Sequence, residues 1–480
     1  MIIQSRYFSI LYILGIILSG VFIGHILIST GNFDLKWTIS ILLVLCCIFL
    51  WPIYGKLAKD PISLLWIILI LSIPFEFNIH LTYRDYIGTF NGILLTITDI
   101  VLFFLFMIWL YQLATDKTNR IQFYPQVTIP VLLFYMTNFF SLTNSPDMNL
   151  SFFSIVQNFK TIILYFFIAN KVRDKAMLHM ILKFLMICLI VEGLFCILQF
   201  ITKTNFTIAF QVVKSLGDET FRIAGTTGSP NVTASYLASM ISVPLLFLLL
   251  YKNQESKLLP LLSTGIGMIA FILTQTRGAW LSFIVGIFLF FLINIKKYKH
   301  MWKVILISLI TIGLTVLLFH NIIIERFAKG AQTAYYRWHL IQSAFEMVRQ
   351  YPIFGIGPNI YALVMKDYVP FFLTQERWIV HNHYLLVWAE LGTVGLIAYL
   401  ILIFSVFRYL WPATKNKDPF ISVFSWGIWT ALFIFFLQMS FESLDGRISD
   451  AHLYLFFGLA VGIRFYHNES MKYIKSENSS

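Results

Sequence analysis

Apolar stretches long enough to cross a lipid bilayer recur along most of this 480-residue sequence. Runs such as Ile62 to Ile73 are apolar on every face, so a helix formed there has no side suited to water. Only 12% of the residues are charged and the mean hydropathy is +0.78, which excludes a water-soluble globule. The runs also lack the alternating pattern of an outer-membrane barrel. The sequence therefore predicts an all-α, polytopic membrane protein.

We expect about 12–14 transmembrane helices, since each needs about 20 mostly apolar residues. The stretches 127–142 and 152–169 are short and flank a polar turn, so the count depends on them. The expected spans are 7–28, 37–54, 62–79, 93–114, 127–142, 152–169, 178–201, 230–251, 258–274, 279–295, 304–320, 383–407, 420–439 and 451–466.

The distribution of positive charge predicts the orientation of the chain. Lys and Arg crowd alternate short connections, for example Lys296, Lys297, Lys299 and Lys303, and are sparse in the others. The positive-inside rule then places both termini in the cytoplasm, with the protein in the cytoplasmic membrane. The net charge of +12 is therefore read as membrane topology, and no nucleic-acid partner is expected.

The largest connection on the expected outer side covers residues 321–382. Within it, Trp338, Ile341, Phe345 and Val348 recur at helical spacing, which predicts an amphipathic helix on the outer membrane interface or over the bundle. We divide the chain at the sequence level into N-terminal transmembrane helices (1–175), a membrane domain with this loop (176–466) and a cytoplasmic tail (467–480).

Three arginines on the expected outer side are candidate anion ligands: Arg222, Arg277 and Arg337. Arg277 lies in a very short turn between two spans, where an unpaired cation is costly and commonly functional. Snorkelling to lipid phosphates is the alternative. Several guanidiniums beside a membrane suit a phosphate or pyrophosphate.

His381 is the candidate acid or base, because histidine titrates near neutral pH and lies here at the start of a span. A hydrogen-bonded interfacial histidine is the alternative. The pair of His381 and His383 lacks a third ligand, so no metal site is expected. Glu390 is expected to orient a loop, and Glu442 to lie in a solvated turn that could contact acceptor sugar.

The order of these elements resembles the O-antigen ligase and polymerase family of bacterial envelope glycan enzymes. The resemblance covers about residues 185–465 and is carried by Arg222-Ile-Ala-Gly with Pro230-Asn231, Thr274-Gln-Thr-Arg277-Gly-Ala-Trp280-Leu, Arg337-Trp338, Pro352-Ile-Phe-Gly355-Ile-Gly357, and His381-Asn382 with Leu385, Glu390, Gly392 and Gly395.

The resemblance implies a metal-independent glycosyltransferase of the GT-C kind, without a cofactor. It implies a glycan on undecaprenyl pyrophosphate as donor and a second glycan as acceptor. By analogy, Arg277 and Arg337 hold the pyrophosphate, and Arg222 is a second-rank candidate for the same anion or the sugars. His381 is then the general base for the acceptor hydroxyl, on the extracytoplasmic side.

Within the family, we expect a polymerase that extends a cell-surface polysaccharide, such as a capsule or a teichuronic-acid-like polymer, with a chain-length regulator as a further partner. A ligase that transfers finished glycan to lipid A core or protein is the alternative. A lipid-linked glycan flippase or other transporter is the alternative of another class, although it would need basic residues along a path through the bundle.

Overall fold

The computed structural model describes residues 61–75, 78–86, 88–116, 119–205, 221–252, 257–297, 330–369, 378–444 and 446–477. The expected spans 7–28, 37–54 and 304–320 lie outside these ranges. The described elements are α3 (Pro61–Ser72), β1 (Asn78–His80), β2 (Leu94–Thr96), α4 (Ile97–Thr115), α5 (Pro125–Ser141), η1 (Leu142–Asn144), α6 (Met148–Lys171), α7 (Lys175–Thr202), α8 (Pro230–Leu250), α9 (Leu258–Leu273), α10 (Arg277–Asn294), α13 (Gly330–Gln350), α14 (Tyr361–Val364), η3 (Met365–Asp367), α15 (His383–Leu410), η5 (Trp411–Lys415), α16 (Pro419–Gln438) and α17 (Arg447–Glu477).

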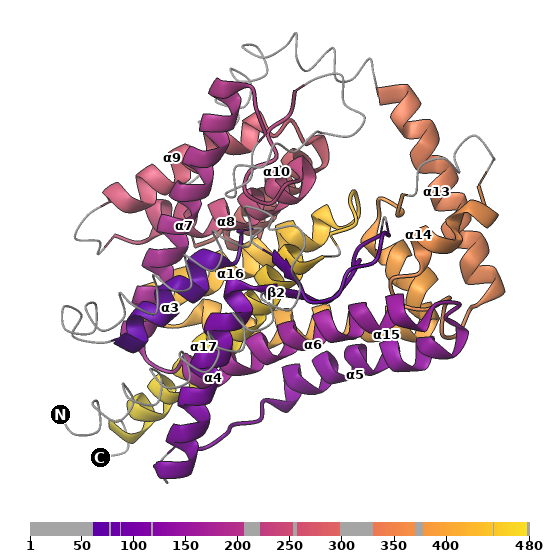
Figure 1. Ribbon diagram of the computed structural model, residues 1–480. Helices are drawn as coiled ribbons and strands as arrows, with labels where there is room; N and C mark the ends of the chain where they lie inside the picture. The colour runs from indigo at the N-terminus through magenta and orange to yellow at the C-terminus, as the bar shows by residue number, and fades with distance from the viewer. Residues whose placement is uncertain are drawn as a thin grey trace, which may run out of the picture.

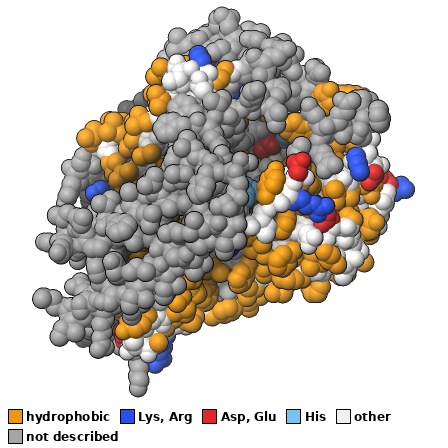
Figure 2. Space-filling model, viewed as in Figure 1, with side chains coloured by type: hydrophobic (Ala, Val, Ile, Leu, Met, Phe, Trp, Pro, Cys, Tyr) orange, Lys and Arg blue, Asp and Glu red, His pale blue; other side chains and the backbone are white. Residues whose placement is uncertain are grey.

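The described helices confirm a polytopic helical membrane protein. Nine of them are long and apolar enough to span a bilayer, and α3 and α9 are shorter apolar helices. The two stretches that left the count open, 127–142 and 152–169, form the helices α5 and α6. Along the lower edge of Figure 2, hydrophobic side chains cover the region where α5 and α15 lie in Figure 1. Such a surface suits contact with lipid.

Two expected spans are shorter than the sequence suggested. Helix α3 ends at Ser72, two residues before Pro74, which lacks a backbone N–H and cannot continue the hydrogen-bond ladder. Helix α4 begins only at Ile97, because Thr96 and Asp99 form a capping box there. The residues left over form the antiparallel strands β1 and β2.

The spanning helices pack as neighbouring pairs around one hydrophobic core. The closest pairs are α8 with α16, α6 with α17, α5 with α15, and α7 with α9, and Figure 1 shows α5 and α6 running side by side. Helix α16 lies deepest, with almost every side chain buried. Among the deepest residues are Phe424 and Phe457.

A second hydrophobic core lies at the end of the bundle where α15 begins, and we call its elements the cap. The cap consists of α13, α14, the connection between β1 and β2, and the residues just before α15. Tyr361 is fully buried in it and donates a hydrogen bond to the Leu340 carbonyl at 2.6 Å. Burial raises the pKa of the Tyr361 phenol, so the hydroxyl stays a neutral donor.

Helix α13 confirms the predicted amphipathic helix, and only part of the expected apolar face is buried. Val348 lies in the cap core and Ile341 packs against it, whereas Trp338 and Phe345 are 58% and 49% exposed. The buried stripe continues through Leu340, Ala344 and Met347, at spacings of four and three residues.

Helix α15 is broken at Gly392, which has φ +68° and ψ −172°. The segment 352–357 pairs with the break: Ile356 N donates to the Ala389 carbonyl at 3.0 Å, and Thr393 N donates to the Pro352 carbonyl at 2.9 Å. Gly355 has φ +71°, and a Cβ there would overlap the Glu390 carbonyl. The first turns of α15 are thereby fixed to the cap.

We predict that Gly355→Ala destabilises the protein by at least about 2 kcal/mol, because alanine would combine a left-handed φ with overlap of backbone atoms. Gly265→Ala is the matched control, since a Cβ at Gly265 in α9 meets nothing within 4 Å. Thermal unfolding of the purified proteins in detergent measures both. Equal unfolding temperatures for the two variants would contradict this account of the break.

Candidate active site

A single carboxylate, Glu442, collects three of the polar side chains at the cap end of the bundle. Glu442 lies in the connection between α16 and α17 and is 8% exposed. Its Oε1 lies 2.6 Å from His381 Nδ1, and its Oε2 lies 3.6 Å from Arg337 Nη2. Oε2 also accepts a hydrogen bond from Asn231 Nδ2 at 2.5 Å. The three partners come from separate segments. His381 lies just before α15, Arg337 lies in α13, and Asn231 lies in α8.

Arg222 joins this cluster through Asn231. The Arg222 Nη2 group donates to Asn231 Oδ1 at 2.9 Å and to Thr276 Oγ1 at 2.8 Å, and Nε donates to the Thr274 carbonyl at 3.2 Å. Arg222 is 8% exposed, so these contacts hold its guanidinium in one place. The arginine therefore ties α8 to the turn between α9 and α10.

Arg277 is the first residue of helix α10, which begins next to the connection between α16 and α17. Its neighbour Gly278 packs so closely that a Cβ there would lie 2.8 Å from the Cβ of Phe441. Phe441 directly precedes Glu442, and its carbonyl accepts a hydrogen bond from Arg337 Nη1 at 3.2 Å. The backbone at Arg277, which is half-buried, therefore starts α10 close to the segment that carries Glu442.

Three helices begin at this cluster. Asn231 lies in the first turn of α8, Arg277 is the first residue of α10, and Asn382 caps α15. The N-terminus of a helix carries partial positive charge and free backbone N–H groups, both of which favour a bound anion. The arginines and the helix N-termini thus both make the electrostatic potential at the cluster more positive.

The loop that carries Arg222 is held in place by side chains of α7. Glu192 is fully buried and accepts hydrogen bonds from Thr226 N at 3.0 Å and Thr226 Oγ1 at 2.5 Å. Two turns further along, Gln199 exchanges two hydrogen bonds with the backbone of Gly225, at 2.8 and 3.0 Å. The sequence analysis did not identify these two residues as supports of the site.

His381 lies on a short segment that runs between the two cores. Val380 is fully buried in the cap, and His383 N donates to the Met439 carbonyl at 2.8 Å. Asn382 donates to the Ser440 carbonyl at 3.2 Å. Because a carboxylate accepts hydrogen bonds, Nδ1 of His381 carries a hydrogen toward Glu442. The opposite nitrogen, Nε2, is bonded by no residue in the described ranges and is the one suited to a substrate hydroxyl.

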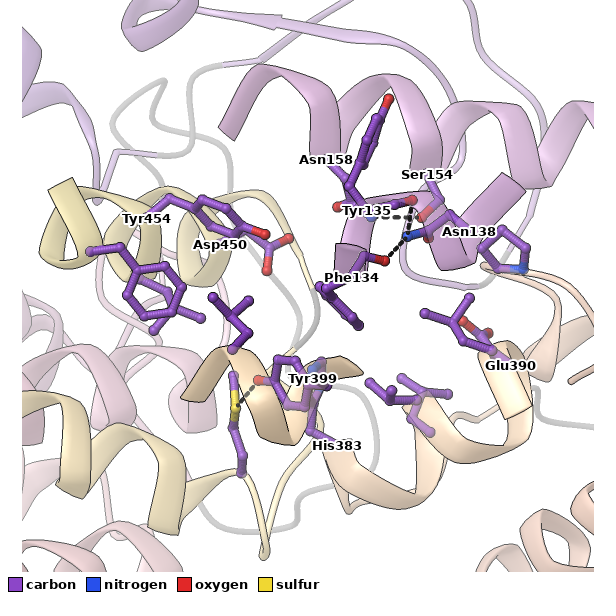
Figure 3. A pocket seen from close by; sticks show the side chains of 18 residues that line it. Phe134, Tyr135, Asn138, Ser154, Asn158, His383, Glu390, Tyr399, Asp450 and Tyr454 are labelled. Atoms are coloured by element: carbon purple, nitrogen blue, oxygen red, sulfur yellow. Dashed lines mark hydrogen bonds between the residues drawn. The ribbon is translucent and has the colours of Figure 1, made fainter. Parts of the chain in front are cut away.

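A pocket lies beside the first turns of α15. Figure 3 shows His383 and Tyr399 of α15 facing Phe134 of α5, with Asp450 of α17 nearby. His383 is 6% exposed, and within the described part of the chain nothing hydrogen-bonds its Nδ1. Glu390 also lines the pocket, yet both its oxygens are engaged by Asn359 N and Tyr361 N.

The structure brings Arg337 and His381 to Glu442 and links Arg222 to it through Asn231. Arg277 is placed only by its neighbour Gly278, which packs against Phe441. The expected role of Glu390 in orienting a loop is supported by its two bonds to the segment 359–361. The interpretation of Glu442 as part of a solvated turn is wrong, because the residue is buried and holds the cluster together. Its place in a polar stretch after a span gave no sign of this burial.

No group of three histidine, cysteine or carboxylate side chains suited to a metal ion occurs among the residues that the structure describes. The described site is instead a cationic cluster around one carboxylate, at the end of a membrane-spanning helical bundle. That arrangement defines a polytopic membrane protein with a cationic, histidine-containing cluster at one end of its bundle.

Residues 261–400 match the sequence model of the O-antigen ligase family. This match confirms the resemblance seen in the sequence: over residues 261–400 the chain is similar to the O-antigen ligase family. The match supports a membrane enzyme of the O-antigen ligase or polymerase type. The matched segment contains Arg277, Arg337 and His381. No curated protein matches the sequence.

We predict that Glu442→Ala lowers the free energy of unfolding by about 1–3 kcal/mol, because His381, Asn231 and Arg337 lose a buried acceptor. Glu346→Ala is the control. Its half-exposed carboxylate pairs only loosely with Arg349 at 3.6 Å, and such surface pairs contribute little. Thermal unfolding in detergent compares the two, and a loss no larger for Glu442→Ala would show that the cluster does not depend on this carboxylate.

Proposed function

We propose that the protein is a polysaccharide polymerase that transfers a growing glycan from undecaprenyl pyrophosphate to a new lipid-linked repeat unit. The observation that carries the proposal is the convergence of Arg222, Arg337 and His381 on Glu442, with Arg277 at the same loop. A cationic site beside a basic nitrogen serves both halves of glycosyl transfer, departure of a pyrophosphate and activation of a hydroxyl.

The arginines are assigned to the leaving group. As the bond between the anomeric carbon and the phosphate oxygen breaks, its electron pair moves onto a pyrophosphate that is already negative. Guanidiniums fixed beforehand stabilise that charge without reorganising. Arg277 and Arg337 are the principal ligands in this proposal, and the buried Arg222 adds a fixed positive charge behind them. The arginines supply this positive charge, so the proposed reaction requires no metal ion.

His381 is assigned to the acceptor. Its Nε2 takes the proton from the attacking hydroxyl as the oxygen bonds to the anomeric carbon. Glu442 holds the ring through Nδ1 and stabilises the imidazolium that results, as a carboxylate does for a catalytic histidine elsewhere. Attack opposite the leaving pyrophosphate inverts the configuration at the anomeric carbon.

The position of the positive charge supports an enzyme over a transporter. The cluster is gathered at one end of the bundle, where three helices begin, and its cations do not follow a path through the described spans. We place this end on the extracytoplasmic side, with both termini in the cytoplasm, as the charge of the connections predicts.

We predict that His381→Ala lowers the rate of polymer synthesis by about 10²–10⁴-fold, the usual contribution of a general base. Arg277→Ala should cost about 10²–10³-fold, as expected when one donor to a developing oxyanion is lost. Arg349→Ala is the control, because its side chain is 81% exposed and its ion pair is with Glu346.

The assay supplies purified enzyme in lipid vesicles with lipid-linked repeat units extracted from native membranes, and resolves product length by electrophoresis. A ladder of longer lipid-linked chains supports a polymerase. Transfer of whole chains to added lipid A core or protein, without elongation, would identify a ligase. Full synthesis by both His381→Ala and Arg277→Ala would refute the proposed site.

A further inference from the structure

Trp378 lies immediately beside the reacting histidine. The centroid of its ring is 6.5 Å from that of His381, and the two planes are inclined by 34°. Its backbone is held by the cap, where Trp378 N donates to Met365 Sδ at 3.2 Å and Met365 is almost fully buried. The residue itself is 40% exposed. The backbone of Trp378 is thus bonded to the cap, and part of its indole surface is exposed next to His381.

The fixed orientation of His381 determines what can lie against this surface. Because Nδ1 faces Glu442, a substrate hydroxyl reaches the ring at Nε2. A sugar whose hydroxyl lies there brings its own ring within reach of the neighbouring indole. The C–H faces of a sugar ring are apolar and slightly positive, and they complement the negative π face of tryptophan.

We propose that Trp378 is a platform on which a sugar ring of the acceptor glycan stacks, so that the acceptor hydroxyl is delivered to His381. This inference rests on the proposed function and adds to it a subsite for the acceptor sugar. Trp378 is a positioning residue in this scheme, since it touches the sugar that reacts but takes no part in proton transfer or in binding the pyrophosphate.

Insertion of Trp378 into the lipid interface is the competing explanation, because aromatic side chains collect there. Trp338 on α13 provides the matched comparison. It is more exposed than Trp378, at 58%, and makes no ring contact with His381 within the described ranges. An interfacial role predicts similar behaviour for the two tryptophans, whereas a sugar platform predicts a difference.

The experiment uses the full-length enzyme in vesicles and two competitors of polymer synthesis. One is the repeat-unit oligosaccharide freed from its lipid by mild acid, which lacks pyrophosphate. The other is inorganic pyrophosphate, which lacks sugar. We expect Trp378→Ala to weaken inhibition by the oligosaccharide about threefold to tenfold, the range for loss of one aromatic contact. Inhibition by pyrophosphate should be unchanged, Trp378→Phe should restore most of the loss, and Trp338→Ala should resemble the wild type.

The outcomes separate this inference from the function on which it rests. If oligosaccharide inhibition is the same in Trp378→Ala and wild type while His381→Ala is inactive, the platform is refuted and the polymerase stands. An equal loss in Trp378→Ala and Trp338→Ala, or a loss for both competitors, refutes the platform in favour of an interfacial or structural role. Full activity of His381→Ala and Arg277→Ala would refute the polymerase assignment itself.

Discussion

The break in α15 at Gly392 is the constraint on which the site geometry depends. An interrupted membrane helix leaves backbone N–H and C=O groups without hydrogen-bond partners, and lipid cannot supply such partners. Here the segment 352–357 supplies the partners, and Ser141 of α5 donates its hydroxyl to the Glu390 carbonyl at 2.5 Å. Glu390 then uses its carboxylate on Asn359 N and Tyr361 N. The contacts at this break therefore hold the cap against α15, orient the first turns of α15 and position the segment that carries His381.

Glu442 stabilises several cationic side chains that lie close together at the end of the helical bundle. Buried or half-buried guanidiniums repel one another unless an anion lies between them. Glu442 is that anion for Arg337, and through Asn231 it reaches the buried Arg222. One carboxylate does not balance all the arginines, so the cluster keeps excess positive charge, which the proposed function assigns to the donor pyrophosphate. The same carboxylate holds Nδ1 of His381, so in that proposal Nε2 faces the acceptor.

The sequence predicted the membrane-spanning helices well, because long apolar runs have few alternatives in a bilayer. It also singled out Arg222, Arg277, Arg337 and His381, since charge placed at the ends of spans is costly and therefore informative. The roles of these four residues stay predictions. The sequence did not reveal features that depend on tertiary contacts. Glu442 sits in an ordinary polar stretch, and its burial depends on contacts with α8 and the cap. The partner surface likewise decides that α13 buries Leu340, Ala344 and Met347 beside Val348 of the expected apolar face.

The reactive cluster lies where two hydrophobic cores meet, and this explains how its parts are divided. Arg337 comes from the cap, whereas Asn231 and Glu442 come from the bundle, and His381 lies between Val380 in one core and His383 in the other. The contact within the bundle is short, 2.5 Å between Asn231 and Glu442, whereas the contacts of Arg337 with the bundle are longer, 3.2 Å to the Phe441 carbonyl and 3.6 Å to Glu442. In the proposed function, the set of arginines that binds the pyrophosphate is complete only when the cap is docked. Gly355 and Gly392, where the cap contacts α15, are then as important to the proposed chemistry as the residues that touch the substrate.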